Sequence, residues 1–165
     1  MTAFPDPGAF TVEGPVQAEI MVLALVDGAV VLSGPCGAAP WYVAVAEGAD
    51  PMAIVTAITR RNAGDPAVVH STSWRQARGG VVLTFVAVVE GAAVSLLDRT
   101  PVVRSSLARG AATAAPWQVP ADAVIEHGLR HLAWLAKDDP VIAAALPEGW
   151  MAVLQNYAPE PFRHL

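Results

Sequence analysis

The segment from His70 to Arg75 is the part of this sequence whose side chains are best suited to chemistry. It consists of polar and amphipathic residues, whereas the other extended segments are rich in Val, Leu and Ala. Because side chains alternate along a strand, His70, Thr72 and Trp74 are predicted to share one face. Arg75 falls on the other face, where a guanidinium can pair with an anion, while the indole of Trp74 can stack on a ring. The segment therefore predicts one side of a ligand site, and the alternative is a solvent-facing strand edge.

His127 and His131 are four positions apart in a segment with helical periodicity, so their rings lie on one side of the helix. This spacing allows two imidazoles to bind one metal ion, but two ligands give a nonspecific signal and Glu126 is the only nearby carboxylate. No metal and no other cofactor is therefore expected. At about 100° per residue, both histidines and Trp134 lie opposite the apolar arc around Leu132. This face is predicted to be an interface covered by the C-terminal tail or by another subunit, unless it is exposed to solvent.

The strands that must position these residues are predicted from local patterns. The apolar segments 18–26 and 29–33 flank Asp27-Gly28, which supplies the positive φ angles of a tight hairpin turn. Residues 41–46 predict a third strand from their β-branched and aromatic content. Residues 67–76 and 81–89, joined by a turn with two glycines, predict a second hairpin, and residues 94–97 predict a further short strand.

Two main helices are predicted. The first begins at Pro51, where Asp50 can cap the exposed amides, and runs to about Ala63 before Gly64 ends it. The second covers residues 121–137 and is followed by short helices at 141–146 and 148–157. Residues 1–15 are predicted to be an irregular lead-in, and residues 103–120 an irregular stretch.

Size and composition predict one domain that folds around its own core. The chain has 165 residues, of which 54% are apolar and 15% charged. Its apolar runs are interrupted by Asp27 and Glu90, far short of the roughly 20 residues of a membrane span. No secretory signal is recognisable, so no membrane partner and a cytoplasmic location are expected. Cys36 is the single cysteine and is predicted to be an inert thiol.

Charge and apolar content also give expectations about partners. The net charge of −5 and the lack of a basic run predict no nucleic-acid partner, because phosphate contacts need clustered Lys or Arg. Sparse charge and high apolar content favour an additional buried surface, and a homodimer is the usual way to provide one.

The order hairpin, strand, helix, hairpin and C-terminal helices, with the segment from Trp41 to Pro51, resembles the Nudix fold. The resemblance implies an α/β (α+β) fold in which a mixed β-sheet is flanked by helices. It implies a single domain over residues 1–165, with a C-terminal helical segment at 121–165. The stretches 70–75 and 129–135 also resemble parts of actinobacterial proteins, and that likeness implies no function.

The box of acidic residues that defines the Nudix family is degenerate in this chain. With the last box glycine placed on Gly64, the box Arg becomes Ala57 and its adjoining Glu becomes Ile58. The paired glutamates become Arg61 and Asn62. In the family these carboxylates hold Mg²⁺ or Mn²⁺ around a diphosphate, because a hard cation needs several oxygen ligands. The resemblance therefore implies the fold without conventional Nudix hydrolysis.

The preferred interpretation is a catalytically silent binding module for a small anionic or aromatic, nucleotide-like ligand or for a protein. The predicted ligand-binding residues are Trp41, Arg61, His70, Thr72, Trp74 and Arg75. One alternative is a Nudix-type hydrolase whose catalytic groups have moved elsewhere. Its candidate residues are Glu47, Asp50, His70, Glu126 and His131. A structural homodimer is the other alternative.

Overall fold

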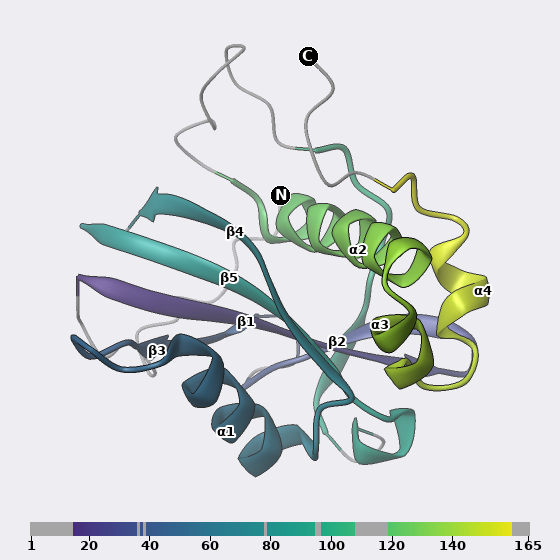
Figure 1. The fold of residues 1–165 in the computed structure, drawn as a ribbon, viewed down its shortest axis with the longest axis horizontal. Helices are drawn as coiled ribbons and strands as arrows, with labels where there is room; N and C mark the ends of the chain where they lie inside the picture. The colour runs from purple at the N-terminus through teal and green to yellow at the C-terminus, as the bar shows by residue number, and fades with distance from the viewer. Residues whose placement is uncertain are drawn as a thin grey trace.

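Helices cover both faces of an open, mixed β-sheet (Figure 1). The computed structural model describes residues 15–35, 37, 39–77, 79–94, 97–107 and 119–159, and within them the sheet has six strands. The strands are β1 (Val16–Val26), β2 (Ala29–Ser33), β3 (Trp41–Ala44), β4 (Val68–Ala77), β5 (Gly80–Val88) and β6 (Arg99–Pro101). The helices are α1 (Pro51–Ala63), the 3-10 turn η2 (Gly91–Val94), α2 (Ala121–Asp138), α3 (Pro140–Ala145) and α4 (Trp150–Leu154). The predicted fold class is confirmed, and the arrangement is consistent with a Nudix-like fold.

Strand β1 is the centre of the sheet and gives it its mixed character. It runs parallel to β5 and antiparallel to β2 and β3, and the order of the described strands is β4-β5-β1-β2-β6, with β3 paired to β1. Most of β1 is buried, which fits its nearly uninterrupted apolar sequence. Strand β4 forms one edge of the described sheet.

The two faces of the sheet carry separate apolar cores. On one face, Met21 and Leu23 of β1 pack against residues of α2 and α4. On the other face, Ile20 of β1 and Phe85 of β5 pack against residues of α1. Figure 1 shows α1 and α2 on opposite sides of the sheet. These sides are named the α1 face and the α2 face.

Local signals explain the first hairpin and the first helix. Asp27 and Gly28 both have positive φ angles, 51° and 78°, as the predicted tight turn requires. Helix α1 begins where the Asp50 side chain accepts a hydrogen bond from the Met52 amide at 2.9 Å, and it ends at Gly64, whose φ is 91°. The predictions of both hairpins, of the strand at Trp41 and of the two main helices are confirmed.

A bulge in the edge strand β4 determines which face its side chains occupy. The register with β5 places Ser71 opposite Phe85 and Ser73 opposite Thr84, so Thr72 is one extra residue. Directly opposite residues of an antiparallel pair share a face. The strict alternation predicted for this segment is therefore wrong, because an extra residue reverses the facing of all residues after it.

The predicted short strand at residues 94–97 does not begin at Val94, and residues 95 and 96 lie outside the described residues. Val94 ends the 3-10 turn η2 and is fully buried, and the sixth strand lies at Arg99–Pro101, where it pairs with β2. The apolar side chain of Val94 packs a turn against the core. Cys36, the lead-in up to residue 14 and residues 108–118 of the predicted irregular stretch lie outside the described residues. Within the described part, no helix combines the length and apolar character needed to cross a bilayer.

Candidate functional site

Glu19 of β1 is the centre of a buried polar cluster on the α2 face. The residue is 1% exposed, and its Oε2 and Oε1 atoms lie 2.6 and 2.8 Å from Nη1 and Nη2 of Arg75 on β4. Thr84 donates its hydroxyl to Oε2 at 2.9 Å, and Tyr42 donates its hydroxyl to Oε1 at 2.5 Å. These four hydrogen bonds offset the cost of burying a carboxylate. Burial lowers the pKa of Arg75, but the hydrogen bonds and charge of Glu19 outweigh it and hold that pKa above its ordinary value.

Gln17 adds a buried acceptor to this region. It lies two residues before Glu19 on the same strand face, is 6% exposed, and its side-chain carbonyl oxygen has no hydrogen-bond partner among the described residues. Nearly all buried polar atoms in proteins are bonded, so an exception calls for an explanation such as a bound water, an ion or a functional role. We name the following five residues the sheet-face cluster: Gln17, Glu19, Tyr42, Arg75 and Thr84.

The sequence of β1 explains why this cluster lies beside α2. Gln17 and Glu19 are followed on the same face by Met21 and Leu23, so the face changes from polar to apolar along the strand. The apolar half packs against α2, and Figure 1 shows β1, β4 and β5 continuing past the N-terminal end of that helix. The sheet-face cluster and α2 therefore occupy neighbouring halves of one sheet face.

A second group of side chains lies where α2 packs against β4. We name it the histidine cluster, made of His70, His127, His131 and Trp134. The Nε2 atoms of His70 and His131 are 3.1 Å apart, and the Trp134 ring meets the His131 ring edge-on with 5.6 Å between centroids. The Nε2 atom of His127 lies 3.4 Å from the carbonyl oxygen of Thr72. Burial lowers the pKa of His70, and burial together with the neighbouring His70 and His127 lowers the pKa of His131 to about 4.

The helix face that carries His127, His131 and Trp134 is covered in part by β4. Among the described residues, His131 contacts His70 and the Nε2 atom of His127 lies near the Thr72 carbonyl oxygen, and both partners belong to β4. The sequence did not predict this contact with β4, because helical periodicity identifies a face but not the element packed against it. The role of this face as an interface stays a prediction.

Helix α1, which the resemblance to the Nudix fold equates with the box helix, contains no acidic residue. Arg61 is exposed, and the side-chain amide of Asn62 donates to the carbonyl oxygen of Ile58 at 2.8 Å. Arg60 pairs with Asp65 just beyond the helix. Across the described residues, no group of three or more His, Cys, Asp or Glu side chains is placed to hold a metal ion.

The predicted ligand-binding residues are divided between the two faces of the sheet. His70, Thr72 and Arg75 lie on the α2 face, whereas Trp41, Arg61 and Trp74 lie on the α1 side. Trp74 is 70% exposed and lies opposite Leu83, which packs on the core that α1 covers. Trp74 and Arg75 are consecutive and lie on opposite faces, and the bulge exchanges the faces on which they lie, placing Trp74 on the α1 side and Arg75 on the α2 face. Trp74 and Arg75 therefore do not line one cleft, and the ligand-binding role of the predicted residues stays a prediction.

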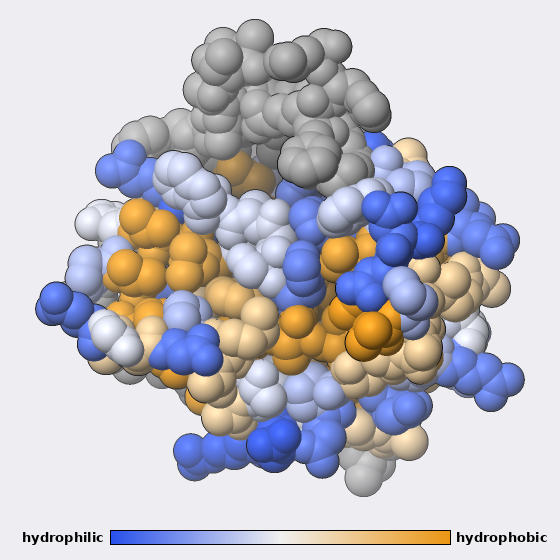
Figure 2. Space-filling model, viewed as in Figure 1, coloured by the Kyte–Doolittle hydropathy of each residue, from blue (hydrophilic) through white to orange (hydrophobic). Residues whose placement is uncertain are grey.

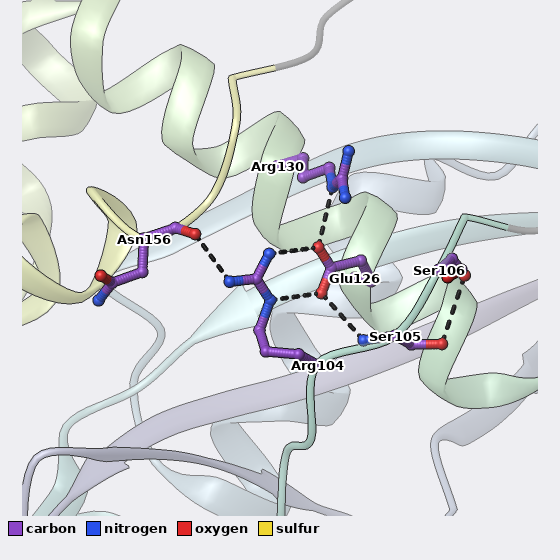
Figure 3. A network of polar contacts seen from close by, with 6 residues as sticks. All are labelled: Arg104, Ser105, Ser106, Glu126, Arg130 and Asn156. Atoms are coloured by element: carbon purple, nitrogen blue, oxygen red, sulfur yellow. Dashed lines mark hydrogen bonds and ion pairs between the residues drawn. The ribbon is translucent and has the colours of Figure 1, made fainter.

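Glu126 of α2 is bound in a separate network, drawn in Figure 3. Its carboxylate, 1% exposed, accepts from Nε and Nη2 of Arg104 at 2.9 and 3.0 Å and from Nε of Arg130 at 2.9 Å. Arg104 also donates to the carbonyl oxygen of Asn156 at 2.7 Å and lies 4.3 Å from the centre of the Tyr157 ring. Burial raises the pKa of Glu126, but both arginines and a backbone amide bring it below its ordinary value. We name Arg104, Glu126 and Arg130 the Glu126 clamp.

The sequence prediction found Arg75 but missed the other residues of the sheet-face cluster. A signal was present for two of them, because Gln17 and Glu19 are polar residues at alternating positions within an otherwise apolar strand. No comparable signal existed for Tyr42 and Thr84. Their meeting with Glu19 depends on the pairing of β3 and β5 with β1, which the sequence does not display.

Comparison with known proteins identifies similar folds only. No protein-family model and no curated protein matches this chain. The crystal structure of Shewanella oneidensis NrtR complexed with a 27mer DNA, a Nudix-fold protein, is similar with a TM-score of 0.54 and 13% identity, over 88% of this chain and 78% of that one. A second NrtR crystal structure gives a TM-score of 0.54 and 15% identity, over 88% and 79% of the two chains. At these identities the likeness shows the fold alone.

The expectation that nucleic acid is excluded as a partner is wrong. It relied on the net charge of −5 and on the lack of a basic run. Yet a protein of similar fold, NrtR, has been crystallised with a 27mer DNA. The net charge of a whole chain does not reveal where its basic residues gather on the surface, so it cannot exclude this class of partner.

Proposed function

We propose that this chain is a single Nudix-like domain that acts in the cytoplasm and binds a small, nucleotide-like ligand without Nudix hydrolysis. The observation that carries the proposal is the buried side-chain carbonyl oxygen of Gln17, which has no hydrogen-bond partner within the part of the chain that the structure describes and lies beside a prearranged set of polar groups. A ligand that offers an N–H or O–H group, such as a base amino group or a sugar hydroxyl, would satisfy this acceptor.

The cost of burying Glu19 and Arg75 supports a recognition role for the sheet-face cluster. Strands β1, β3, β4 and β5 are already joined by backbone pairing, so this ion pair is not needed to hold them together. Replacing a buried ion pair with apolar residues is often neutral or stabilising. A costly charge that the fold does not require is consistent with a surface that recognises a polar ligand.

The composition of α1 supports binding without hydrolysis. The box positions carry Ala57, Ile58, Arg61 and Asn62, none of which is an acid that could gather Mg²⁺. Of the acids considered for a relocated catalytic site, Glu126 is bound to two arginines and Asp50 caps α1. Both carboxylates therefore have structural roles, which weakens the alternative of a relocated hydrolase.

The test uses a panel of nucleoside diphosphate compounds with Mg²⁺ or Mn²⁺. At least one compound is expected to raise the melting temperature of the wild type with no hydrolysis product detected by chromatography. Gln17→Leu should abolish this shift, while Gln155→Leu, the same change at the exposed residue that follows α4, should keep it. Metal-dependent turnover by the wild type, or a full shift in Gln17→Leu, would refute the proposal.

Duplex DNA is a second candidate partner, supported by the fold shared with NrtR and its 27mer DNA complex. Acidic residues outnumber basic ones, 15 to 10, so we expect weak binding that falls steeply as salt is added. Fluorescence anisotropy with a labelled 27-base-pair duplex measures this directly. Salt-sensitive binding would support the second candidate, and no anisotropy change at low salt would remove it.

A structural homodimer is a third candidate, supported by the surface. Figure 2 shows a band of apolar side chains across the view, interrupted by hydrophilic ones. Val141 of α3 and Met151 of α4 are among the exposed apolar residues, at 73% and 45%. Sedimentation velocity at micromolar concentration should then give a dimer, and a monomer would exclude this candidate.

A further inference from the structure

His70 and His131 meet although 61 positions separate them in the sequence. One ring comes from the edge strand β4 and the other from α2, and their Nε2 atoms are 3.1 Å apart. The ring planes are tilted by 32° with centroids 5.0 Å apart, so the rings approach through their nitrogens and are not stacked face to face. Without a bound ion, one imidazole donates its N–H to the other.

The distance between these nitrogens also suits a shared metal ion. Zinc binds imidazole nitrogen at about 2.0–2.1 Å, and at that length two nitrogens 3.1 Å apart subtend roughly 95–102° at the ion. This angle lies between those of octahedral and tetrahedral coordination. An ion would replace the shared hydrogen, and the displaced proton would move to Nδ1 of the same ring.

We propose that His70 and His131 form a binding site for a late first-row divalent metal ion, such as Zn²⁺, Ni²⁺ or Cu²⁺. The proposal goes beyond the ligand-binding function above and does not depend on it. Two imidazoles and no carboxylate at the site favour these ions over Mg²⁺ and Ca²⁺, which require oxygen ligands. Trp134 packs edge-on against His131 and acts as a positioning residue for that ring.

The site is open among the described residues, which provide only part of the coordination shell. No third His, Cys, Asp or Glu of the described residues completes a metal-binding group with this pair. His127 lies one helical turn away, with its ring centre 6.3 Å from that of His131, and is not in a coordinating position. Water or an exchangeable ligand must fill the remaining positions, so we expect reversible binding.

The test is isothermal titration calorimetry of the full chain with ZnCl₂ and NiCl₂, and with MgCl₂ as a comparison. We expect one Zn²⁺ or Ni²⁺ per chain and no heat of binding with Mg²⁺. His70→Asn and His131→Asn should each weaken binding at least tenfold. His164→Asn, a matched change at the fourth histidine of the sequence, should leave the affinity unchanged.

A second measurement keeps the proposal testable if a variant does not fold. Long-range ¹H–¹⁵N spectra of the wild-type imidazoles should show Zn²⁺ shifting the Nε2 signals of His70 and His131 but not those of His164. Three results would overturn the proposal: no binding of any ion, equal affinity for Mg²⁺, or imidazole signals of the pair that do not change on saturation.

Discussion

Glu19 and Glu126 are equally buried, both 1% exposed and both bound to arginine, yet they connect different kinds of structure. In the Glu126 clamp, Arg104 comes from an irregular segment and also binds the Asn156 carbonyl beyond α4. The clamp therefore joins α2 to two segments that have no strand pairing with it. In the sheet-face cluster, the partners of Glu19 lie on strands that the sheet already joins.

The comparison shows that the contribution of a buried ion pair to stability depends on which other interactions connect the two segments that carry it. Where no backbone pairing connects the segments, the pair stabilises the fold, and its loss should loosen their contact. Where backbone pairing already connects them, the pair contributes a fixed arrangement of polar groups at some cost in stability. We therefore assign a structural role to Glu126 and a recognition role to Glu19.

The largest effect is expected at the Glu126 clamp. Glu126→Ala leaves Arg104 and Arg130 without their shared carboxylate and should lower the free energy of unfolding by about 3 kcal/mol. This value is at the lower end of the range for a broken buried pair, because Arg104 is half exposed. Urea denaturation measures the change. Glu148→Ala, a matched change at an exposed glutamate, should stay within about 0.5 kcal/mol of wild type. Equal losses in the two variants would remove the structural role of the clamp.

A smaller net effect is expected when both charges of the sheet-face cluster are removed. Arg75→Leu alone should cost about 3 kcal/mol, because it leaves Glu19 buried without its cation. Glu19→Leu combined with Arg75→Leu should recover most of that loss, since no unpaired charge is left. The corresponding double change at Glu126 and Arg104 should not recover the lost free energy of unfolding, because it removes the link between α2 and the segment of Arg104. Recovery in both pairs, again from urea denaturation, would show that the two glutamates do not differ.

The smallest effect is a pH dependence that belongs to Glu126. Its pKa is lower in the folded chain than its ordinary value of 4.5. The stability it contributes is therefore complete above pH 4.5 and is lost as the pH falls through the lowered folded value. The difference in melting temperature between wild type and Glu126→Gln should shrink as the pH is lowered below 4.5. A difference that stays constant down to pH 2 would contradict this linkage.

The sequence predicted the elements well and the candidate site poorly, for a physical reason. The turn at Asp27-Gly28 and the helix between Asp50 and Gly64 are set by neighbouring residues, so local patterns predict them. The sheet faces on which Trp74 and Arg75 lie depend on the β-bulge at Thr72, and no residue type in this segment predicts a bulge. Contacts between distant elements, such as that of His70 with His131, depend on how α2 packs, and periodicity does not contain that information.

The most direct test of the recognition role is calorimetric titration of the nucleoside diphosphate panel into wild type and into the Glu19→Leu/Arg75→Leu variant. The two proteins should unfold at similar temperatures. At least one compound should bind the wild type without being cleaved, and none should bind the double variant measurably. Unchanged affinity in a folded double variant would contradict the assignment of this sheet face as the ligand site.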